Sequence, residues 1–207
     1  DALNDLLKAA APQNDSALLA AMVADIQAGD ADALYGKLER ARAERLPAAF
    51  CDDIAGPLLR EVGEYWLTDT ALIAREHLAT ATLARVLAGV KPLDRASGKR
   101  PVVFGTIPPE RHLIGTAMAA YVAEQCGFPA IVVAPGATVE EIAATAAHAR
   151  AAGVGMSVVY FDAEHTVREL AQALDALPLW VGGAKAAAGP WTRFSTMREF
   201  AQSLYEL

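Results

Sequence analysis

Apolar and polar positions follow one another at helical spacing through the first 90 residues of the chain. Leu18, Met22 and Ile26, for example, place an apolar side chain on the same helix face at every turn. The pattern predicts four helices, at residues 16–29, 31–46, 48–67 and 71–90. Since the connections between them are short, we expect an antiparallel four-helix bundle.

Helix-breaking residues separate these segments. Gly29, the Leu46-Pro47 pair and the polar step at Asp69-Thr70 mark three boundaries. Pro57 lies inside the third predicted helix, where it removes a backbone donor and should kink or divide the helix. Residues 91–100 are polar and rich in breakers, which is typical of a linker.

After residue 100 the pattern changes to short apolar runs that alternate with helical segments. Strands are predicted at 101–107, 130–135, 154–161 and 178–183, and helices at 113–126, 138–153, 166–177 and 197–207. This alternation is typical of a parallel sheet covered by helices on both faces. The fold class is therefore α/β with an N-terminal all-α part, with domains at 1–92 and 101–207.

Composition narrows the class of protein. Hydrophobic residues make up 54% of the 207 residues and charged residues 21%, which excludes a disordered chain. A net charge of −7 without a basic stripe argues against direct nucleic-acid binding. The longest apolar runs fall short of a membrane span, and two cysteines are too few for a disulfide framework. We expect a cytoplasmic protein that does not contact a membrane.

The loop after the first predicted strand carries the first candidate site, in the order Glu110, Arg111, His112 and, after two residues, Gly115. In parallel sheets, ligands bind at the carboxyl ends of the strands. His112 could ligate a metal there, with Glu110 accepting a hydrogen bond from the other imidazole nitrogen. Gly115 would allow close approach to the next helix. The plainer interpretation is a charged surface loop. A dinucleotide site is excluded because no G-x-G-x-x-G follows the strand.

Two later positions complete a pattern. Ser157 and Val159 lie in the third predicted strand, and Gly182-Gly183 end the fourth. Each feature alone is more often a packing detail or a turn. Together, the spacing E-x-H-x-x-G, S-x-V and G-G resembles the cobalamin-binding fold of methionine synthase and the carboxyl-shifting mutases, a Rossmann-like (flavodoxin-like) domain whose usual motifs are D-x-H-x-x-G, S-x-L and G-G.

This resemblance implies a cofactor and a set of contacts. It implies that His112 ligates cobalt from the lower face, in place of the benzimidazole of the cofactor. It also implies that the benzimidazole tail enters a slot lined by Ser157 and Gly182-Gly183. The chain departs from the usual motifs at Glu110 and Val159, and both replacements are conservative.

A second motif lies in the predicted bundle. Trp66 is followed after nine residues by Glu76 and His77. The plainer interpretation is a core tryptophan and a solvated helix turn. The W-x9-E-H pattern, however, resembles the helical cap of CarH-type light-sensing regulators, and the resemblance covers nearly the whole chain. It implies that the three side chains cover the upper cofactor face and enclose its 5′-deoxyadenosyl group. Leu67 stands where the best-known members have a cobalt-capturing histidine, and the DNA-binding segment of the family is not expected in this chain.

The resemblance favours a sensor over an enzyme. We expect a domain that binds adenosylcobalamin and regulates transcription through a light-dependent conformational or oligomeric change, acting on a homo-oligomer or a regulatory protein partner. Hydroxocobalamin or methylcobalamin are the other possible forms of the cofactor. The alternatives are a corrinoid methyl carrier serving methyltransferases, an antirepressor that binds hydroxocobalamin, and a cobalamin store.

Overall fold

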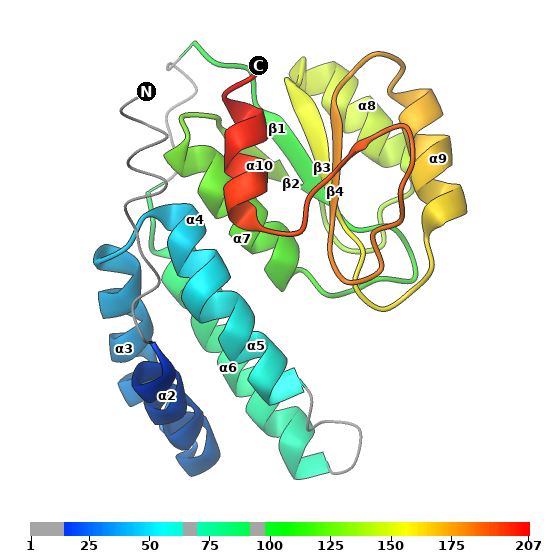
Figure 1. Cartoon of the computed structure of the whole chain (residues 1–207). Helices are drawn as coiled ribbons and strands as arrows, with labels where there is room; N and C mark the ends of the chain where they lie inside the picture. The colour runs from blue at the N-terminus through cyan, green and yellow to red at the C-terminus, as the bar shows by residue number, and fades with distance from the viewer. Residues whose placement is uncertain (1–14, 64–69, 92–97) are drawn as a thin grey trace. The chain divides into compact units, whose positions relative to one another are not determined.

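The chain consists of two compact units that divide after Val90, and each is described here by itself. The computed structural model describes residues 15–63, 70–91 and 98–207 (Figure 1). Trp66 and Leu67 lie outside the described residues. The division lies close to the predicted linker.

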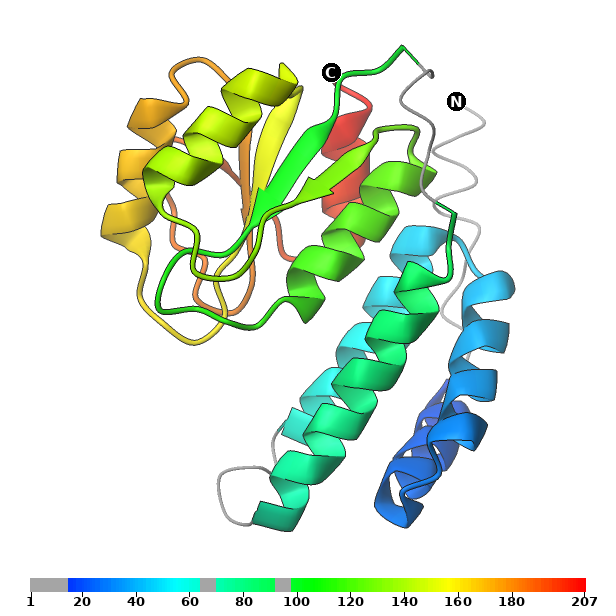
Figure 2. The same ribbon diagram turned by 180° about the vertical axis from the view of Figure 1, so that it is seen from behind.

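The first unit is a bundle of helices, shown from behind in Figure 2. Its elements are α2 (Ser16–Ala28), α3 (Ala31–Ala43), α4 (Pro47–Phe50), the π-helix η1 (Cys51–Ala55), α5 (Gly56–Gly63) and α6 (Thr70–Ala88). Helix α2 contacts α3 and α5, and α6 contacts the same two helices, so that the four long helices form a closed ring. The side chains of Met22, Leu34, Leu38, Ile54, Leu58 and Leu83 are fully buried within it.

The third predicted helix is divided, as Pro57 led us to expect. The π-helix η1 precedes the proline, and the backbone N–H of Gly56 bonds to the carbonyl of Cys51, five residues back. Proline has no N–H and its ring would clash with the carbonyl four residues back, at Asp53. The wider π turn accommodates both constraints, and the chain continues as α5 in nearly the same direction (Figure 1).

The second unit is a parallel sheet of five strands in the order β2-β1-β3-β4-β5. Its strands are β1 (Val102–Gly105), β2 (Ala130–Val132), β3 (Gly153–Ser157), β4 (Leu179–Gly182) and β5 (Thr192–Arg193). Its helices are α7 (Ile114–Gln125), α8 (Val139–Ala149), α9 (Glu164–Ala173) and α10 (Met197–Leu204). The order is that of a flavodoxin-like fold, and the predicted fold class is confirmed.

Helices cover both faces of the sheet. Helices α7 and α10 contact each other on one face, and α8 and α9 contact each other on the other (Figures 1 and 2). Alternate residues of the strands divide between the two sides. Val103, Val154 and Met156 join the apolar core beneath α8 and α9. The rings of Phe104 and Trp180 meet Phe200 of α10 on the opposite side.

Small residues of β3 admit these aromatic rings. A Cβ atom at Gly155 would lie 2.6 Å from the ring of Phe104, and one at Gly153 would lie 2.3 Å from that of Trp180. The glycines are therefore required by packing on the α7 face. Within the described residues, no helix combines the length and apolar character that crossing a membrane requires.

Candidate functional site

The predicted motif lies at the point where the strand order reverses. Strands β1 and β3 are neighbours in the sheet, but α7 after β1 and α9 after β3 cover opposite faces. The two loops that leave these strands therefore lead to opposite faces of the sheet, and such folds bind ligands at this position of the carboxyl edge. Glu110 and His112 lie in the first loop, and Val159 and Tyr160 in the second.

The Glu110 carboxylate joins the two loops. Its Oε2 accepts the backbone N–H of Val159 at 3.2 Å and that of Tyr160 at 2.9 Å. Its Oε1 accepts the backbone N–H groups of Arg111 and His112, at 3.1 and 3.0 Å, and Nδ1 of His112 at 2.5 Å. The side chain is buried, so these donors replace the water that the carboxylate loses.

The same contacts determine the charge of Glu110. Burial raises the pKa of its carboxyl, but hydrogen bonds from the amide of Tyr160, the ring and amide of His112 and the amide of Val159 lower it. The lowering contributions prevail, and the pKa lies below its ordinary value. Glu110 is therefore an ionised acceptor at neutral pH, consistent with a proton on Nδ1 of His112.

Because of these contacts, β3 ends earlier than its apolar run predicts. We expected the strand to continue to residue 161, but it ends at Ser157. Val158 still donates to the carbonyl of Gly182, after which the amides of Val159 and Tyr160 turn to Glu110. For these two amides, the Glu110 carboxylate thus takes the place of the carbonyl acceptors of the neighbouring strand.

His112 presents its other nitrogen away from Glu110. A proton held on Nδ1 leaves the lone pair on Nε2, the form in which histidine ligates a metal. The side chain is 41% exposed, and its ring lies 4.3 Å from that of Tyr160, centroid to centroid. The expected hydrogen bond between His112 and Glu110 is therefore present, and the imidazole is oriented and accessible.

The residue set fits a corrinoid better than a free metal ion. The described residues contain no group of three or more histidine, cysteine, aspartate or glutamate side chains that could hold an ion. A corrin ring supplies four equatorial nitrogens, so that its cobalt requires only one axial ligand from the protein. One oriented histidine, His112, meets that requirement, and its ligand role stays a prediction.

Gly115, Ser157 and Gly182 lie on the same side of the sheet. A Cβ atom at Gly115 would lie 2.8 Å from Oγ of Ser157, so the first turn of α7 contacts the end of β3 closely. Ser157 is the register partner of Gly182 in the neighbouring strand. Ser157 and Gly182 thus lie side by side in the sheet, and Gly115 in the first turn of α7 contacts Ser157. The glycine at 115 is already explained by this protein contact.

The space beside Gly182 is filled. A Cβ atom there would lie 2.4 Å from the ring of Phe194, which follows β5 and stacks on Phe200. A Cβ atom at Gly183 would lie 2.3 Å from the carbonyl oxygen of Val158, and φ at Gly183 is +109°. We expected an open slot here. The missing side chains instead accommodate the Phe194 ring and the backbone of Val158, directly after β3.

Of the bundle motif, the structure describes Glu76 and His77 on α6. Oε1 of Glu76 accepts the Thr80 hydroxyl at 2.7 Å, and Oε2 lies 3.5 Å from Nε2 of His77. The His77 side chain is 73% exposed. Because Trp66 is outside the described residues, the three-residue motif stays a prediction.

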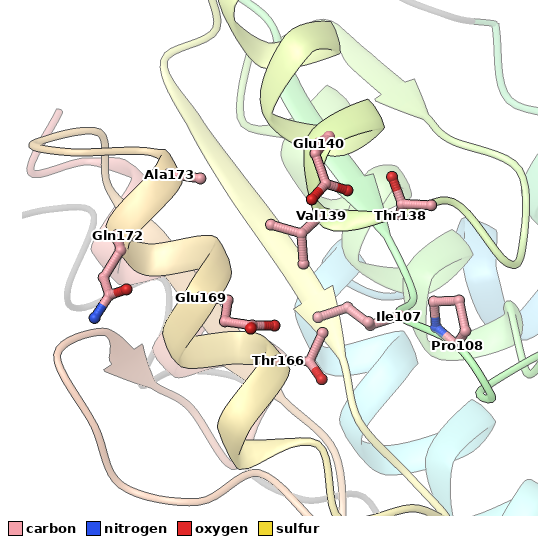
Figure 3. A pocket seen from close by; sticks show the side chains of 9 residues that line it. All are labelled: Ile107, Pro108, Thr138, Val139, Glu140, Thr166, Glu169, Gln172 and Ala173. Carbon is pink, nitrogen blue, oxygen red and sulfur yellow. The ribbon is translucent and has the colours of Figure 1, made fainter.

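A pocket of about 440 Å³ lies on the opposite face, between α8 and α9 (Figure 3). Ile107 and Pro108 form one wall, while Glu140 and Glu169 line it from the two helices. None of the residues that the sequence patterns single out lines this pocket. The pocket is therefore separate from the α7 side, where the motif residues converge.

Pattern reasoning missed three residues of the candidate site. Tyr160 contacts the imidazole, Phe194 fills the space at Gly182, and Thr116 places a buried hydroxyl beside Gly115. Tyr160 stands near the carboxyl end of the third predicted strand, and an aromatic residue at that position was a usable signal. Phe194 follows a strand of two residues, which is too short to show alternation.

Sequence comparison identifies the family of the helical unit. Residues 18–91 match the family described as the B12 binding domain. The chain is also 31% identical over 170 residues to the HTH-type transcriptional repressor CarH of Myxococcus xanthus. The match covers 80% of this chain and 57% of that protein. The chain is a B12-binding protein related to CarH. It spans little more than half the length of that curated relative.

A solved structure shows the same fold. The monomethylamine corrinoid protein of Methanosarcina barkeri aligns with a TM-score of 0.66, covering 93% of this chain and all of that chain at 12% identity. A cobalamin-binding protein from Desulfitobacterium hafniense aligns with a TM-score of 0.47 at 20% identity, covering 91% of this chain and 97% of that chain. At such low identity, the first likeness shows the fold alone: a helical unit followed by a parallel-sheet unit.

Proposed function

We propose that this chain is the sensory part of a light-responsive transcriptional regulator, and that it binds adenosylcobalamin. The observation that carries the cofactor assignment is the Glu110–His112 pair, which presents one oriented imidazole at the sheet's switch point. The relationship to the repressor CarH supports a regulatory role. In this proposal the chain signals through a homo-oligomer or a protein partner and catalyses no reaction.

Each unit has its own part in the proposed function. The cofactor would supply a cobalt–carbon bond that light cleaves. His112 would hold cobalt through Nε2, with Glu110 accepting a hydrogen bond from Nδ1 and so orienting the imidazole. Glu76, His77 and Trp66 would recognise the adenosyl group. When that group is lost, their contacts are lost with it, so the conformation or assembly of the chain can change.

The test is reconstitution with adenosylcobalamin in the dark, followed by green light. We expect a change in the visible absorption spectrum together with a change in elution volume on size exclusion. Protein loaded with methylcobalamin or hydroxocobalamin provides the matched comparison. An elution volume that light leaves unchanged, in a chain that accepts methyl groups from a methyltransferase, would replace this proposal with the carrier function. A response to hydroxocobalamin alone would indicate the antirepressor.

A further inference from the structure

Thr116 has a buried hydroxyl that no group among the described residues satisfies. Its side chain is 2% exposed, and Oγ1 has no hydrogen-bond partner within the part of the chain that the structure describes. Buried hydroxyls are usually paired, because burying one without a partner costs stability. An unpaired hydroxyl at this depth therefore calls for an explanation.

Packing does not provide one. Thr116 begins a stripe of buried residues on α7 that continues with Ala119, Ala120 and Ala123, at the spacing of one helix face. Helix α7 packs on β1 and β3. The rest of the stripe is alanine, so a valine at 116 would fill a similar volume without an unpaired polar atom.

The position of Thr116 points to a ligand. A Cβ atom at Gly115, directly before it, would lie 2.8 Å from Oγ of Ser157, and Ser157 is in register with Gly182. The hydroxyl thus lies in the first turn of α7, which covers β1 and β3 on the side of the sheet that Ser157 faces. Glu110 and His112 lie in the loop that leads into the same helix.

We propose that the Thr116 hydroxyl binds the nucleotide tail of cobalamin by a hydrogen bond. This inference rests on the proposed cobalamin binding and adds a residue outside the three sequence motifs. A hydroxyl both donates and accepts, so it suits a benzimidazole nitrogen or a ribose oxygen. The free protein bears the cost of the unpaired group, and the bound tail removes it.

The test compares hydroxocobalamin with hydroxocobinamide, which has the corrin ring and cobalt but lacks the nucleotide tail. Affinities are measured by spectroscopic titration in wild type, Thr116→Val and Thr116→Ser. We expect Thr116→Val to weaken hydroxocobalamin binding by about three- to tenfold and to leave hydroxocobinamide binding unchanged. Thr116→Ser should retain the wild-type ratio of the two affinities.

Thermal unfolding without ligand separates this role from a structural one. If the hydroxyl is unpaired in the free protein, Thr116→Val should melt at the same temperature as wild type or higher. Thr82→Val, at a buried threonine of the helical unit, controls for general effects of the substitution and should leave the affinity ratio unchanged.

Two results would overturn the inference in different ways. In the first, wild type prefers hydroxocobalamin, and Thr116→Val either keeps that preference or loses affinity for both corrinoids equally. Thr116 then does not contact the tail, while the proposed cobalamin binding is unaffected. If wild type binds neither corrinoid, the proposed function fails and this inference fails with it.

Discussion

Oε1 of Glu110 lies 2.5 Å from Nδ1 of His112, while Oε2 of the same carboxylate accepts the backbone N–H groups of Val159 and Tyr160. One buried side chain thus orients the imidazole and joins the loops that follow β1 and β3. If either function is lost, the other is disturbed, because both depend on the same ionised group. Ligation is therefore tested by changing His112, and the stability of the two loops by changing Glu110.

The ligand role of His112 can be tested directly. In protein loaded with cobalamin and reduced to Co(II), we expect electron paramagnetic resonance to show coupling to a histidine nitrogen, altered by ¹⁵N-histidine. His112→Ala should abolish that coupling and weaken cobalamin binding by at least tenfold, the equivalent of about 1.4 kcal/mol. His148→Ala and His165→Ala change exposed histidines and should match wild type. Retained coupling in His112→Ala would assign the ligand to another histidine.

Replacing Glu110 by glutamine should destabilise the sheet unit. A glutamine has one acceptor oxygen, so its NH₂ group must face either the amides of Val159 and Tyr160 or the donors on the His112 side. Buried donors left unpaired cost about 1–3 kcal/mol. Chemical denaturation at pH 7 measures the loss. Glu164→Gln, at an exposed carboxylate in the same unit, is the control.

The pKa of Glu110 determines how the stability difference between wild type and Glu110→Gln depends on pH. The folded state lowers this pKa below its ordinary value of 4.5. The stabilisation is therefore complete above about pH 4.5 and is lost as pH falls through the lower folded value. We expect the stability gap between wild type and Glu110→Gln to be constant from pH 7 to 5 and to narrow below 4.5. A gap that widens in acid would contradict an ionised Glu110.

The sequence predicted the parts of the fold that repeat. Alternating apolar runs and amphipathic segments indicated β1 to β4 and the helices between them, and Pro57 correctly marked a division in the third helix. The two-residue strand β5 shows no periodicity and was missed. The end of β3 could not be predicted from the residues of the strand. It depends on Glu110, about 50 residues earlier, which accepts hydrogen bonds from the backbone amides of Val159 and Tyr160.

In the candidate site, too, local contacts could be predicted from the sequence and contacts between distant segments could not. The spacing of Glu110 and His112 within one loop predicted their hydrogen bond. The two residues are only two positions apart, so the local conformation of the loop is enough to bring their side chains into contact. The filling of the space at Gly182 depends on Phe194, whose ring direction is set by stacking on Phe200. Long-range packing of this kind leaves no pattern in the local sequence.

Gly182 should be intolerant of even one methyl group. A Cβ atom there would lie 2.4 Å from the Phe194 ring, so Gly182→Ala should lower the free energy of unfolding by about 1–3 kcal/mol. Gly105→Ala is a matched control at the end of β1, where a Cβ atom would meet Ile142 at an ordinary 3.6 Å. Any larger side chain at position 182 would disrupt protein packing in the same way.

A double-mutant cycle tests whether the Phe194 ring causes the loss of stability in Gly182→Ala. Phe194→Leu removes the ring and should partly relieve the clash, so that Gly182→Ala costs less in the Phe194→Leu background than in wild type. The expected coupling energy is at least about 0.5 kcal/mol, measured by chemical denaturation. Strictly additive effects would show that Phe194 does not restrict position 182.

The bundle motif predicts which form of the cofactor is preferred. Glu76 has its Oε1 bound to the Thr80 hydroxyl, and its side chain is 24% exposed. The carboxylate is therefore oriented and accessible enough to accept ribose hydroxyls. Trp66, outside the described residues, would add an aromatic contact of about 0.5–1.5 kcal/mol beyond its buried area.

Glu76→Ala and Trp66→Ala should each reduce the preference for adenosylcobalamin over hydroxocobalamin. For Glu76→Ala, ribose hydroxyls lose their acceptor at a cost of about 1–3 kcal/mol, or roughly five- to 150-fold in affinity. Hydroxocobalamin has no adenosyl group, so its affinity should stay the same. The measurement is the ratio of the two dissociation constants in the dark. Glu44→Ala, at an exposed carboxylate of the same unit, is the control. An unchanged ratio in both variants would make the motif structural and remove the main support for light sensing.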